Sequence, residues 1–312
     1  MPQTVGRLTN IQKMRRNIRT VLMGNGFYDT VNYTLVRKKY IEDAVMSNGE
    51  AVELVSPLSD DRRYIRTSLF SSLLETMAYN LDHYNENVNL FEISKVYYQD
   101  HEEERLGMIM EGDLSDNKVK HLTVKTDFYV LKGIVEELLT SMGFSMNRIV
   151  LKENDIDKVH FHPYQSAVLY LDDRLLGIFG KLNPTYLKSF KMQDVYYGEM
   201  ILDVLDSAVP ARTKAPAVSK YPSVTRDISL LLKDDVKAGD LLSTIKKAGG
   251  NMVKSYQVFD VYQGEHIEKG YKSVSLNIVY EDLNKTLTAE DVNAVHGKIV
   301  KALTETYDAV QR

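Results

Sequence analysis

The spacing of hydrophobic residues in the first two-thirds of the chain predicts a mixture of helices and strands. Apolar positions recur with helical spacing in "LTNIQKMRRNIRTVLMGNGF", where Thr9 has the side chain of an N-cap, and again in "RTSLFSSLLETMAYNLDHY" and "DFYVLKGIVEELLTSMGF". Strands are predicted in "DTVNYTLV", "AVELVSPLS", "VNLFEISKVYYQD", "RLGMIMEGD" and "YGEMILDVL", and a hairpin that turns at Asp172-Asp173 in "SAVLYLDDRLLGIFGKL". Because helices and strands do not alternate regularly, we expect an α+β fold.

The last hundred residues have a different and more regular order. Strand, helix, strand, strand, helix and short strand are predicted in "RDISLLL", "KAGDLLSTIKKAGG", "VKSYQVFDVYQG", "GYKSVSLNIVYED", "LTAEDVNAVHGKIVKALTETY" and "DAVQR". This β-α-β-β-α-β order is typical of a ferredoxin-like domain. Both helices are expected on one face of the sheet, which leaves the other face open.

A proline-rich segment separates the two parts. "SAVPARTKAPAVSKYP" has three prolines and no periodic apolar pattern, as linkers do. We therefore expect a first domain over residues 1–208, a linker over 209–221 and a second domain over 222–312. A length of 312 residues also favours two domains over one.

Composition narrows the class of protein. The chain has no cysteine, which excludes disulfides and thiolate metal sites. No segment approaches the roughly 20 apolar residues of a membrane span, and the N-terminus lacks the apolar core of a secretory signal, so we expect a cytoplasmic protein without a membrane partner. The net charge is −4, yet residues 1–40 contain eight Lys or Arg and one acid. This basic region is either a contact for phosphates or an acidic protein, or a solvated helix face.

The open face of the predicted second sheet is a candidate binding surface. If the aliphatic residues of its first strand point at the helices, Ser229 faces the opposite way, together with Ser275 of the third strand. The second strand adds either Tyr256 and Tyr262 or Phe259, because its register is ambiguous. Hydroxyl groups beside an aromatic ring suit an unpaired, stacked base. A plain solvated sheet face is the alternative interpretation.

Several segments resemble one family. "YPSVTRDISLLL" and "ETYDAVQR" resemble the two ends of the ferredoxin-fold anticodon-binding domain of phenylalanyl-tRNA synthetase, which closes the beta subunit of the bacterial enzyme. "GRLTNIQKMRRNIRTVLMGNGFYDTVNYTLV", "LVSPLSDDRRYIRTSLFSSLLETMAYNL", "NVNLFEISKVYYQ" and "FHPYQSAVLYLDDRLLGIFGKLNP" resemble the class II synthetase-like module of that subunit. The resemblance implies a class II synthetase-like antiparallel sheet with helices, followed by a ferredoxin-like domain. No segment resembles the tRNA-binding and editing modules of the family, so we expect the C-terminal part of a longer subunit.

Two departures from class II synthetases bear on catalysis. An arginine in the strand of motif 2 holds the α-phosphate of ATP in such enzymes, because a guanidinium binds phosphate with two parallel hydrogen bonds. Here "SKVYYQD" has Tyr98 at that place, and the motif 3 segment "YYGEMILDVL" has Gly198 and Glu199 but no arginine. The resemblance therefore implies a chain without catalytic residues or bound cofactors, in an assembly whose alpha subunit handles ATP and magnesium ion.

The resemblance also implies partners. These are the phenylalanine–tRNA ligase alpha subunit, in a heterotetramer of two alpha and two beta subunits, and tRNA(Phe). Because the first class II motif builds the dimer interface, we expect the first helix to contact the alpha subunit through Arg15, Arg16, Ile18 and Arg19. The candidate tRNA contacts in the second domain are Arg226, Ser229, Tyr256, Tyr262, Lys272 and Ser275.

Other sites and functions are weaker candidates. His160 and His162 have the spacing of metal ligands on a strand, but no third ligand is evident, so a structural role is favoured and no metal is expected. One rival function is an amino-acid-sensing, ACT-like regulatory protein, although "LLKDDVKAGD" offers only Gly239 for the glycine-containing loop that such domains use. The other is a free-standing RNA-binding relative of synthetases without an alpha partner.

Overall fold

The chain divides into two compact units, Met1–Thr213 and Lys214–Arg312. The computed structural model describes residues 6–211, 218–265 and 267–311. The division falls within the predicted linker, 209–221, of which residues 212–217 lie outside the described residues. Both units combine helices with antiparallel strands, so the α+β class is confirmed.

The first unit is built on a seven-stranded sheet with the strand order β1-β4-β5-β11-β10-β9-β8. All neighbours are antiparallel except β1 and β4, which are parallel. The strands are β1 (Tyr28–Asp29), β4 (Asn89–Tyr97), β5 (Glu102–Met110), β8 (Ile149–Glu153), β9 (Phe161–Leu171), β10 (Arg174–Leu182) and β11 (Tyr196–Ile201). The predicted hairpin turn joins β9 to β10, and Asp172 and Asp173 both have the positive φ that such a tight turn requires.

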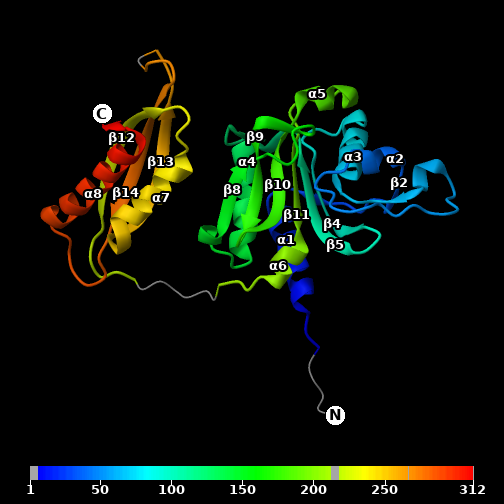
Figure 1. The fold of residues 1–312 in the computed structure, drawn as a ribbon, viewed down its shortest axis with the longest axis horizontal. Coiled ribbons are helices and arrows are strands. Elements are labelled where there is room, and N and C mark those ends of the chain that lie inside the picture. The colour runs from blue at the N-terminus through cyan, green and yellow to red at the C-terminus, as the bar shows by residue number, and fades with distance from the viewer. Residues whose placement is uncertain (1–5, 212–217, 266, 312) are drawn as a thin grey trace, which may run out of the picture. The chain divides into compact units, whose positions relative to one another are not determined.

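Helices cover both faces of this sheet (Figure 1). They are α1 (Asn10–Gly24), α2 (Lys38–Glu42), α3 (Phe70–Asp82), α4 (Phe128–Ser141), α5 (Pro184–Leu187) and α6 (Leu202–Ser207). Ile18 and Leu22 of α1 and Leu131 of α4 belong to one hydrophobic core, whereas Phe70 and Leu73 of α3 belong to a second. The sheet therefore separates two cores.

The start of α1 follows from its sequence. Thr9 and Gln12 form a capping box, in which the Gln12 amide donates to the Thr9 hydroxyl (3.3 Å) and the Thr9 amide donates to the Gln12 side chain (3.0 Å). The helix ends at Gly24, and Asn25 follows as its C-cap.

Some predicted strands are wrong. "AVELVSPLS" forms no strand and makes only an isolated bridge between Glu53 and Tyr64. "DTVNYTLV" is strand only near its ends, as part of β1 and as β2 (Leu35–Val36), which pairs with β3 (Tyr64–Ile65). The hairpin of β6 (Asp113–Asn117) and β7 (Leu122–Lys125) was not predicted.

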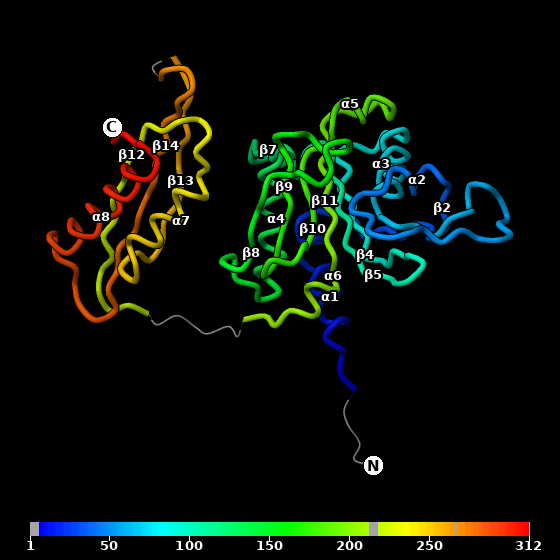
Figure 2. Tube along the Cα trace, in the orientation of Figure 1, coloured from blue at the N-terminus to red at the C-terminus, as the bar shows by residue number. Residues whose placement is uncertain are grey.

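The second unit has the predicted order β12 (Val224–Lys233), α7 (Ala238–Gly249), β13 (Val253–Tyr262), β14 (Tyr271–Tyr280), α8 (Ala289–Tyr307) and β15 (Val310–Gln311). Its four-stranded sheet has the order β13-β14-β12-β15. Ile228, Leu241, Leu276 and Ile299 pack in a core between the sheet and the two helices. The path of the chain through this ferredoxin-like unit can be followed in Figure 2.

Candidate functional site

Tyr98, predicted to stand where a class II enzyme has its phosphate-binding arginine, is a core residue. It directly follows β4 and is 4% exposed. Its hydroxyl donates to the carbonyl oxygen of Thr67 (3.0 Å) and accepts from Nη2 of Arg105 (2.9 Å). Its ring stacks on His101, with centroids 4.5 Å apart. Burial raises the pKa of Tyr98 above its ordinary value, so the neutral phenol is favoured.

A fully buried ion pair lies beside Tyr98. Arg105 of β5 donates from Nη1 to Oε1 of Glu199 of β11 (2.8 Å), and both side chains are buried. Glu199 also accepts from the hydroxyls of Ser68 (2.8 Å) and Tyr197 (2.5 Å). Burial opposes the charge of Arg105, but Glu199, Tyr98 and Glu103 together outweigh it and raise the pKa of the guanidinium.

The second buried guanidinium of this unit is also neutralised. Arg66 donates from Nη2 to Glu92 of β4 (2.8 Å), and neither side chain is exposed. Glu92 also accepts from the side-chain amide of Asn32 (2.8 Å). Both buried guanidiniums, Arg66 and Arg105, therefore already face a buried carboxylate.

Sequence reasoning missed Arg105, Arg66 and Glu92. Each stands within or next to an apolar run, in "ERLGMIM", "YIRTSLF" and "NLFEIS". A charged residue inside a strand that is otherwise buried is the signal that could have predicted buried ion pairs, since such charges are rarely buried without a partner.

The arginines predicted at a subunit interface lie on α1 in different environments. Arg16 is exposed. Arg15 pairs with Glu104 (2.5 Å) and Arg19 pairs with Asp29 (2.7 Å), and both keep part of their side chain in solvent. The prediction is wrong for Ile18, because its side chain lies in the unit's own core and cannot reach a partner.

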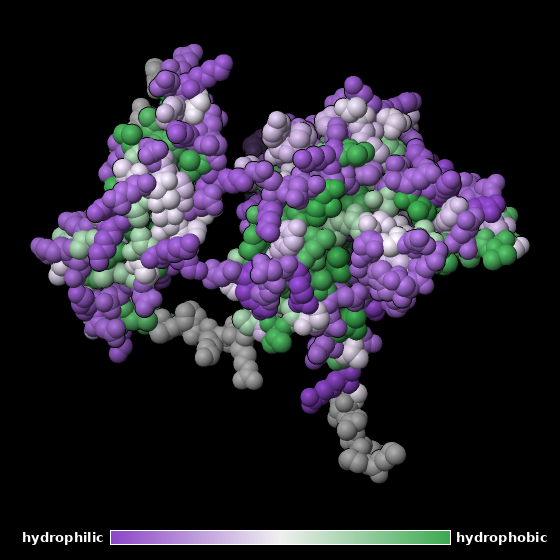
Figure 3. Space-filling view, viewed as in Figure 1, coloured by the Kyte–Doolittle hydropathy of each residue, from purple (hydrophilic) through white to green (hydrophobic). Residues whose placement is uncertain are grey.

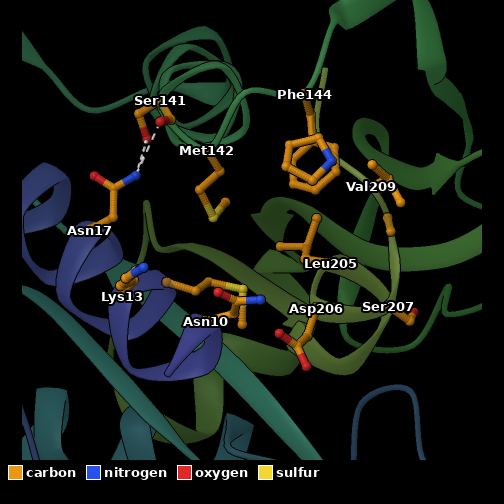
Figure 4. A pocket seen from close by; sticks show the side chains of 13 residues that line it. Asn10, Lys13, Asn17, Ser141, Met142, Phe144, Leu205, Asp206, Ser207 and Val209 are labelled. Carbon is orange, nitrogen blue, oxygen red and sulfur yellow. Dashed lines mark hydrogen bonds between the residues drawn. The ribbon is translucent and has the colours of Figure 1, made fainter. Parts of the chain in front are cut away.

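A groove of about 600 Å³ lies between α1, the end of α4 and α6 (Figure 4). Asn17 closes one side by donating to the carbonyl and hydroxyl oxygens of Ser141 (3.1 and 3.3 Å). Met142 and Leu205 form part of its apolar wall, and Lys13 lies at its α1 side. None of the four residues predicted at the interface lines it.

His160 and His162 have packing and hydrogen-bonding roles. His160 is buried, contacts Asp157 through Nδ1 (2.8 Å) and meets the edge of Phe70. Burial raises the pKa of Asp157, but the hydrogen bonds from the ring and the backbone of His160 and from the backbone of Val159 act together against it, so the pKa is lowered. His162 accepts from the amide of Tyr164 (3.2 Å). Among residues 6–211, 218–265 and 267–311, no three His, Cys, Asp or Glu side chains form a group that could hold a metal ion.

In the second unit, Ser229 and Ser275 lie together as predicted. They are opposite each other on β12 and β14, and their hydroxyl oxygens are 2.8 Å apart. Ile228 and Leu276, which alternate with them, are buried against the helices, so the two serines lie on the open face. The next pair on this face, Asp227 and Asn277, is joined by a hydrogen bond of 2.6 Å.

A β-bulge decides the ambiguous register of β13. Tyr256 pairs with the buried Ile278 and packs on the core side, whereas Tyr262 pairs with Ser273 on the open face. The change of face follows from an extra residue between Val258 and Asp260. This residue, Phe259, is exposed. The open-face prediction therefore holds for Tyr262 and is wrong for Tyr256.

Arg226 and Lys272 also lie on the helix side of the sheet. Arg226 pairs with Ile278, and its charge acts on Tyr280 and on His296 of α8. Lys272 pairs with Leu232 and donates from Nζ to the carbonyl oxygen of Asp234 (2.7 Å). Both keep exposed or partly exposed side chains, but neither shares the surface of the serines.

Each of the two units matches the model of a known protein family. Residues 1–202 match the model described as the phenylalanyl tRNA synthetase beta chain CLM domain, and residues 219–312 match the ferredoxin-fold anticodon binding domain. The chain belongs to the phenylalanyl-tRNA synthetase beta chain family. The resemblance seen in the sequence and the predicted fold class are thereby confirmed.

Relatives in the beta chain family match over nearly the whole chain. The phenylalanine–tRNA ligase beta subunit of Bacillus subtilis is 35% identical over 99% of this chain and 39% of that protein. The beta subunit of Staphylococcus epidermidis is 34% identical over 96% of this chain and 38% of that protein. The chain therefore spans about two fifths of the length of these relatives.

Solved structures similar to this beta chain family member include two of the pyrrolysyl-tRNA synthetase of Desulfitobacterium hafniense. Their TM-scores are 0.47 and 0.46 and their sequence identities 12% and 14%. The alignments cover 63% of this chain and 65% and 68% of those chains. In the ranges that the structure describes, no helix is both long and apolar enough to cross a bilayer.

Proposed function

We propose that this chain is the C-terminal part of a phenylalanine–tRNA ligase beta subunit, in which the first unit docks the catalytic alpha subunit and the second binds the anticodon region of tRNA(Phe). The assembly contains two alpha and two beta subunits, works in the cytoplasm and charges tRNA at the expense of ATP. The proposal rests on two family matches that follow each other along the chain: the beta chain CLM domain on the first unit and the anticodon binding domain on the second.

We further propose that the chain takes no direct part in forming the aminoacyl adenylate. Tyr98 is packed in the core, and the guanidiniums of Arg105 and Arg66 are paired with buried carboxylates. ATP, magnesium ion and phenylalanine are bound at the alpha subunit in this proposal. The purified chain should show no phenylalanine-dependent ATP–pyrophosphate exchange, and exchange should appear when the alpha subunit is added. Exchange by the chain alone would contradict this part of the proposal.

Docking is tested by mixing the chain with the alpha subunit of the same organism. Size-exclusion chromatography with light scattering should reveal a complex heavier than either component. Separate elution at micromolar concentration would contradict the docking role and favour a free-standing RNA-binding protein.

RNA binding is tested on the open face, which carries the paired hydroxyls of Ser229 and Ser275 and, opposite Ser273 on the neighbouring strand, Tyr262. The chain should bind tRNA(Phe) more tightly than a tRNA(Phe) with an altered anticodon. Calorimetry with phenylalanine is the matching experiment for the amino-acid-sensing alternative. Binding of phenylalanine, and not of tRNA, would favour that alternative.

A further inference from the structure

A small cavity of the first unit lies between α2, α3 and α5. Its volume is about 220 Å³, below the roughly 300–1,000 Å³ of sites for drug-sized ligands, so only a small molecule fits. The three helices lie together at one end of the unit in Figure 1, and Figure 3 shows mainly hydrophilic residues over α5. On this side, the surface around α5 is therefore not the exposed apolar patch that marks a protein contact.

One carboxylate of the cavity has no basic partner. Asp43 directly follows α2 and keeps 25% of its side chain exposed, and none of the described Lys or Arg residues forms an ion pair with it. The hydroxyl of Tyr186 is hydrogen-bonded to this carboxylate. Burial and the charge of Asp43 raise the pKa of Tyr186, so the phenol stays protonated and acts as the donor. A carboxylate that accepts one such bond still has lone pairs for further donors.

Two buried acceptor atoms in or beside the cavity make no hydrogen bond with any described residue. One is Nε2 of His160, whose side chain is 8% exposed and lies 4.0 Å from Oδ1 of Asp43. The other ring nitrogen contacts the carboxylate of Asp157 (2.8 Å), so the neutral ring has its proton at Nδ1 and its lone pair at Nε2. The second atom is Oγ of Ser71, on the cavity wall. Because burying a polar atom without a hydrogen bond costs free energy, the two atoms indicate a ligand that donates.

The other walls of the cavity supply apolar surface and one positive charge. The ring centroids of Tyr186 and Phe190 lie 5.6 Å apart. Nζ of Lys39 lies 5.8 Å from the centre of the Phe190 ring, and no acid in the described part of the chain pairs with it. Arg37 and Glu75 also line the cavity, but they pair with each other (3.1 Å), so their charges offset each other.

We propose that this cavity binds a small molecule with a primary ammonium group and an apolar body, either a free amine or an amino acid. A primary ammonium has three N–H donors, and the acceptors are the Asp43 carboxylate, Nε2 of His160 and Oγ of Ser71. The first two acceptors are 4.0 Å apart, which one nitrogen about 2.9 Å from each can bridge. The apolar body lies against the two aromatic rings. Lys39 meets the carboxylate of an amino acid, which a free amine lacks.

The experiment compares three probes that share one carbon skeleton: isoamylamine, L-leucine and isocaproate. Binding to the full chain is measured by calorimetry. Isoamylamine should bind, whereas isocaproate, which has a carboxylate in place of the ammonium, should not. Tighter binding of L-leucine than of isoamylamine would identify an amino acid as the source of the ammonium, and equal or weaker binding would identify a free amine.

Three variants locate the binding. Asp43→Asn keeps the shape of the side chain and should weaken isoamylamine binding about tenfold or more, because it removes the charge that faces the ammonium. Glu75→Gln is the matched control, since Glu75 lines the same cavity but is paired, and it should bind within about twofold of the unaltered chain. Ser71→Ala should weaken binding several-fold without lowering the melting temperature, because the hydroxyl that it removes has no partner among the described residues.

Several results would overturn the proposal. Failure of both isoamylamine and L-leucine to bind would do so, as would binding of isocaproate as tight as that of isoamylamine. Equal weakening by Asp43→Asn and Glu75→Gln would mean that negative charge in general, and not this site, attracts the probe. None of these results bears on docking of the alpha subunit or on tRNA binding, which are measured separately.

Discussion

Replacing Glu199 with glutamine tests whether the buried pair of Arg105 and Glu199 stabilises the first unit. The substitution keeps the shape of the side chain and removes its charge. The carboxylate accepts hydrogen bonds from Arg105 Nη1, Ser68 Oγ and Tyr197 OH. A glutamine side chain offers one acceptor oxygen and one donor group, so its NH₂ would face a donor. Arg105 would also lose its fully buried counter-charge.

The size of the effect follows from burial. Breaking a buried ion pair by neutralising one partner costs about 3–5 kcal/mol. Glu103 remains, and it accepts from Nη2 of Arg105 at 2.7 Å. Because this partly buried carboxylate keeps some compensation for the guanidinium, we expect the lower end of that range, about 3 kcal/mol.

The assay is urea unfolding followed by tyrosine fluorescence and circular dichroism. The chain has 20 tyrosines and no tryptophan. Its two compact units should unfold in separate transitions, so the midpoint of the second unit is an internal control. Glu136→Gln is the matched control, because Glu136 pairs with Lys132 on the exposed side of α4 (2.7 Å) and such pairs contribute only about 0.3–0.5 kcal/mol.

Two results would refute the reasoning. If Glu199→Gln lowered the free energy of unfolding no more than Glu136→Gln does, the buried pair would not stabilise the first unit. An equal loss in Glu103→Gln would be equally damaging, because Glu103 is the less buried of the two carboxylates that pair with Arg105.

Three other outcomes follow from the geometry. Tyr262→Ala should weaken tRNA binding in a filter assay by about 1–3 kcal/mol. Tyr256→Ala should instead lower the melting temperature of the second unit and leave RNA affinity unchanged. The reverse pattern would contradict the register of β13. Ile18→Ala should destabilise the first unit by about 2–5 kcal/mol in urea unfolding, and the exposed Arg16→Ala should not. Burial and the charge of Arg226 lower the pKa of His296, so the unfolded chain binds a proton at this residue more readily than the folded chain does. The second unit should therefore lose stability as the pH falls through about 6.5. His296→Gln should flatten this profile, measured as urea unfolding midpoints from pH 5 to 8.

Local sequence signals predicted much of the fold. Thr9 caps α1 and Asp172-Asp173 turns the β9–β10 hairpin, because each of these effects depends on only a few neighbouring residues. The segment around Val55 could not be predicted in the same way. Its apolar residues resemble a strand, but only long-range pairing with residues near Tyr64 determines how much of it joins a sheet.

The candidate sites were predicted less well, for two physical reasons. One extra residue in β13 moves Tyr256 and Tyr262 to opposite faces, and a bulge leaves no clear mark in an alternating pattern. Ile18 shares a helix with Arg15, Arg16 and Arg19, but a helix presents neighbouring residues in different directions, so one of the four is in the core. The pairing of Arg105 with Glu199 joins strands nearly a hundred residues apart and depends on the order of the sheet.

The contact between Tyr98 and Arg105 has an evolutionary consequence. An arginine at position 98 would bring a second positive charge to within a few ångströms of the guanidinium that Tyr98 now meets at 2.9 Å. Two like charges without water between them repel strongly, so an intermediate with that single change would be selected against. A cation at position 98 therefore fits this core only if Arg105 changes with it, so the residue types at positions 98 and 105 should vary together among relatives.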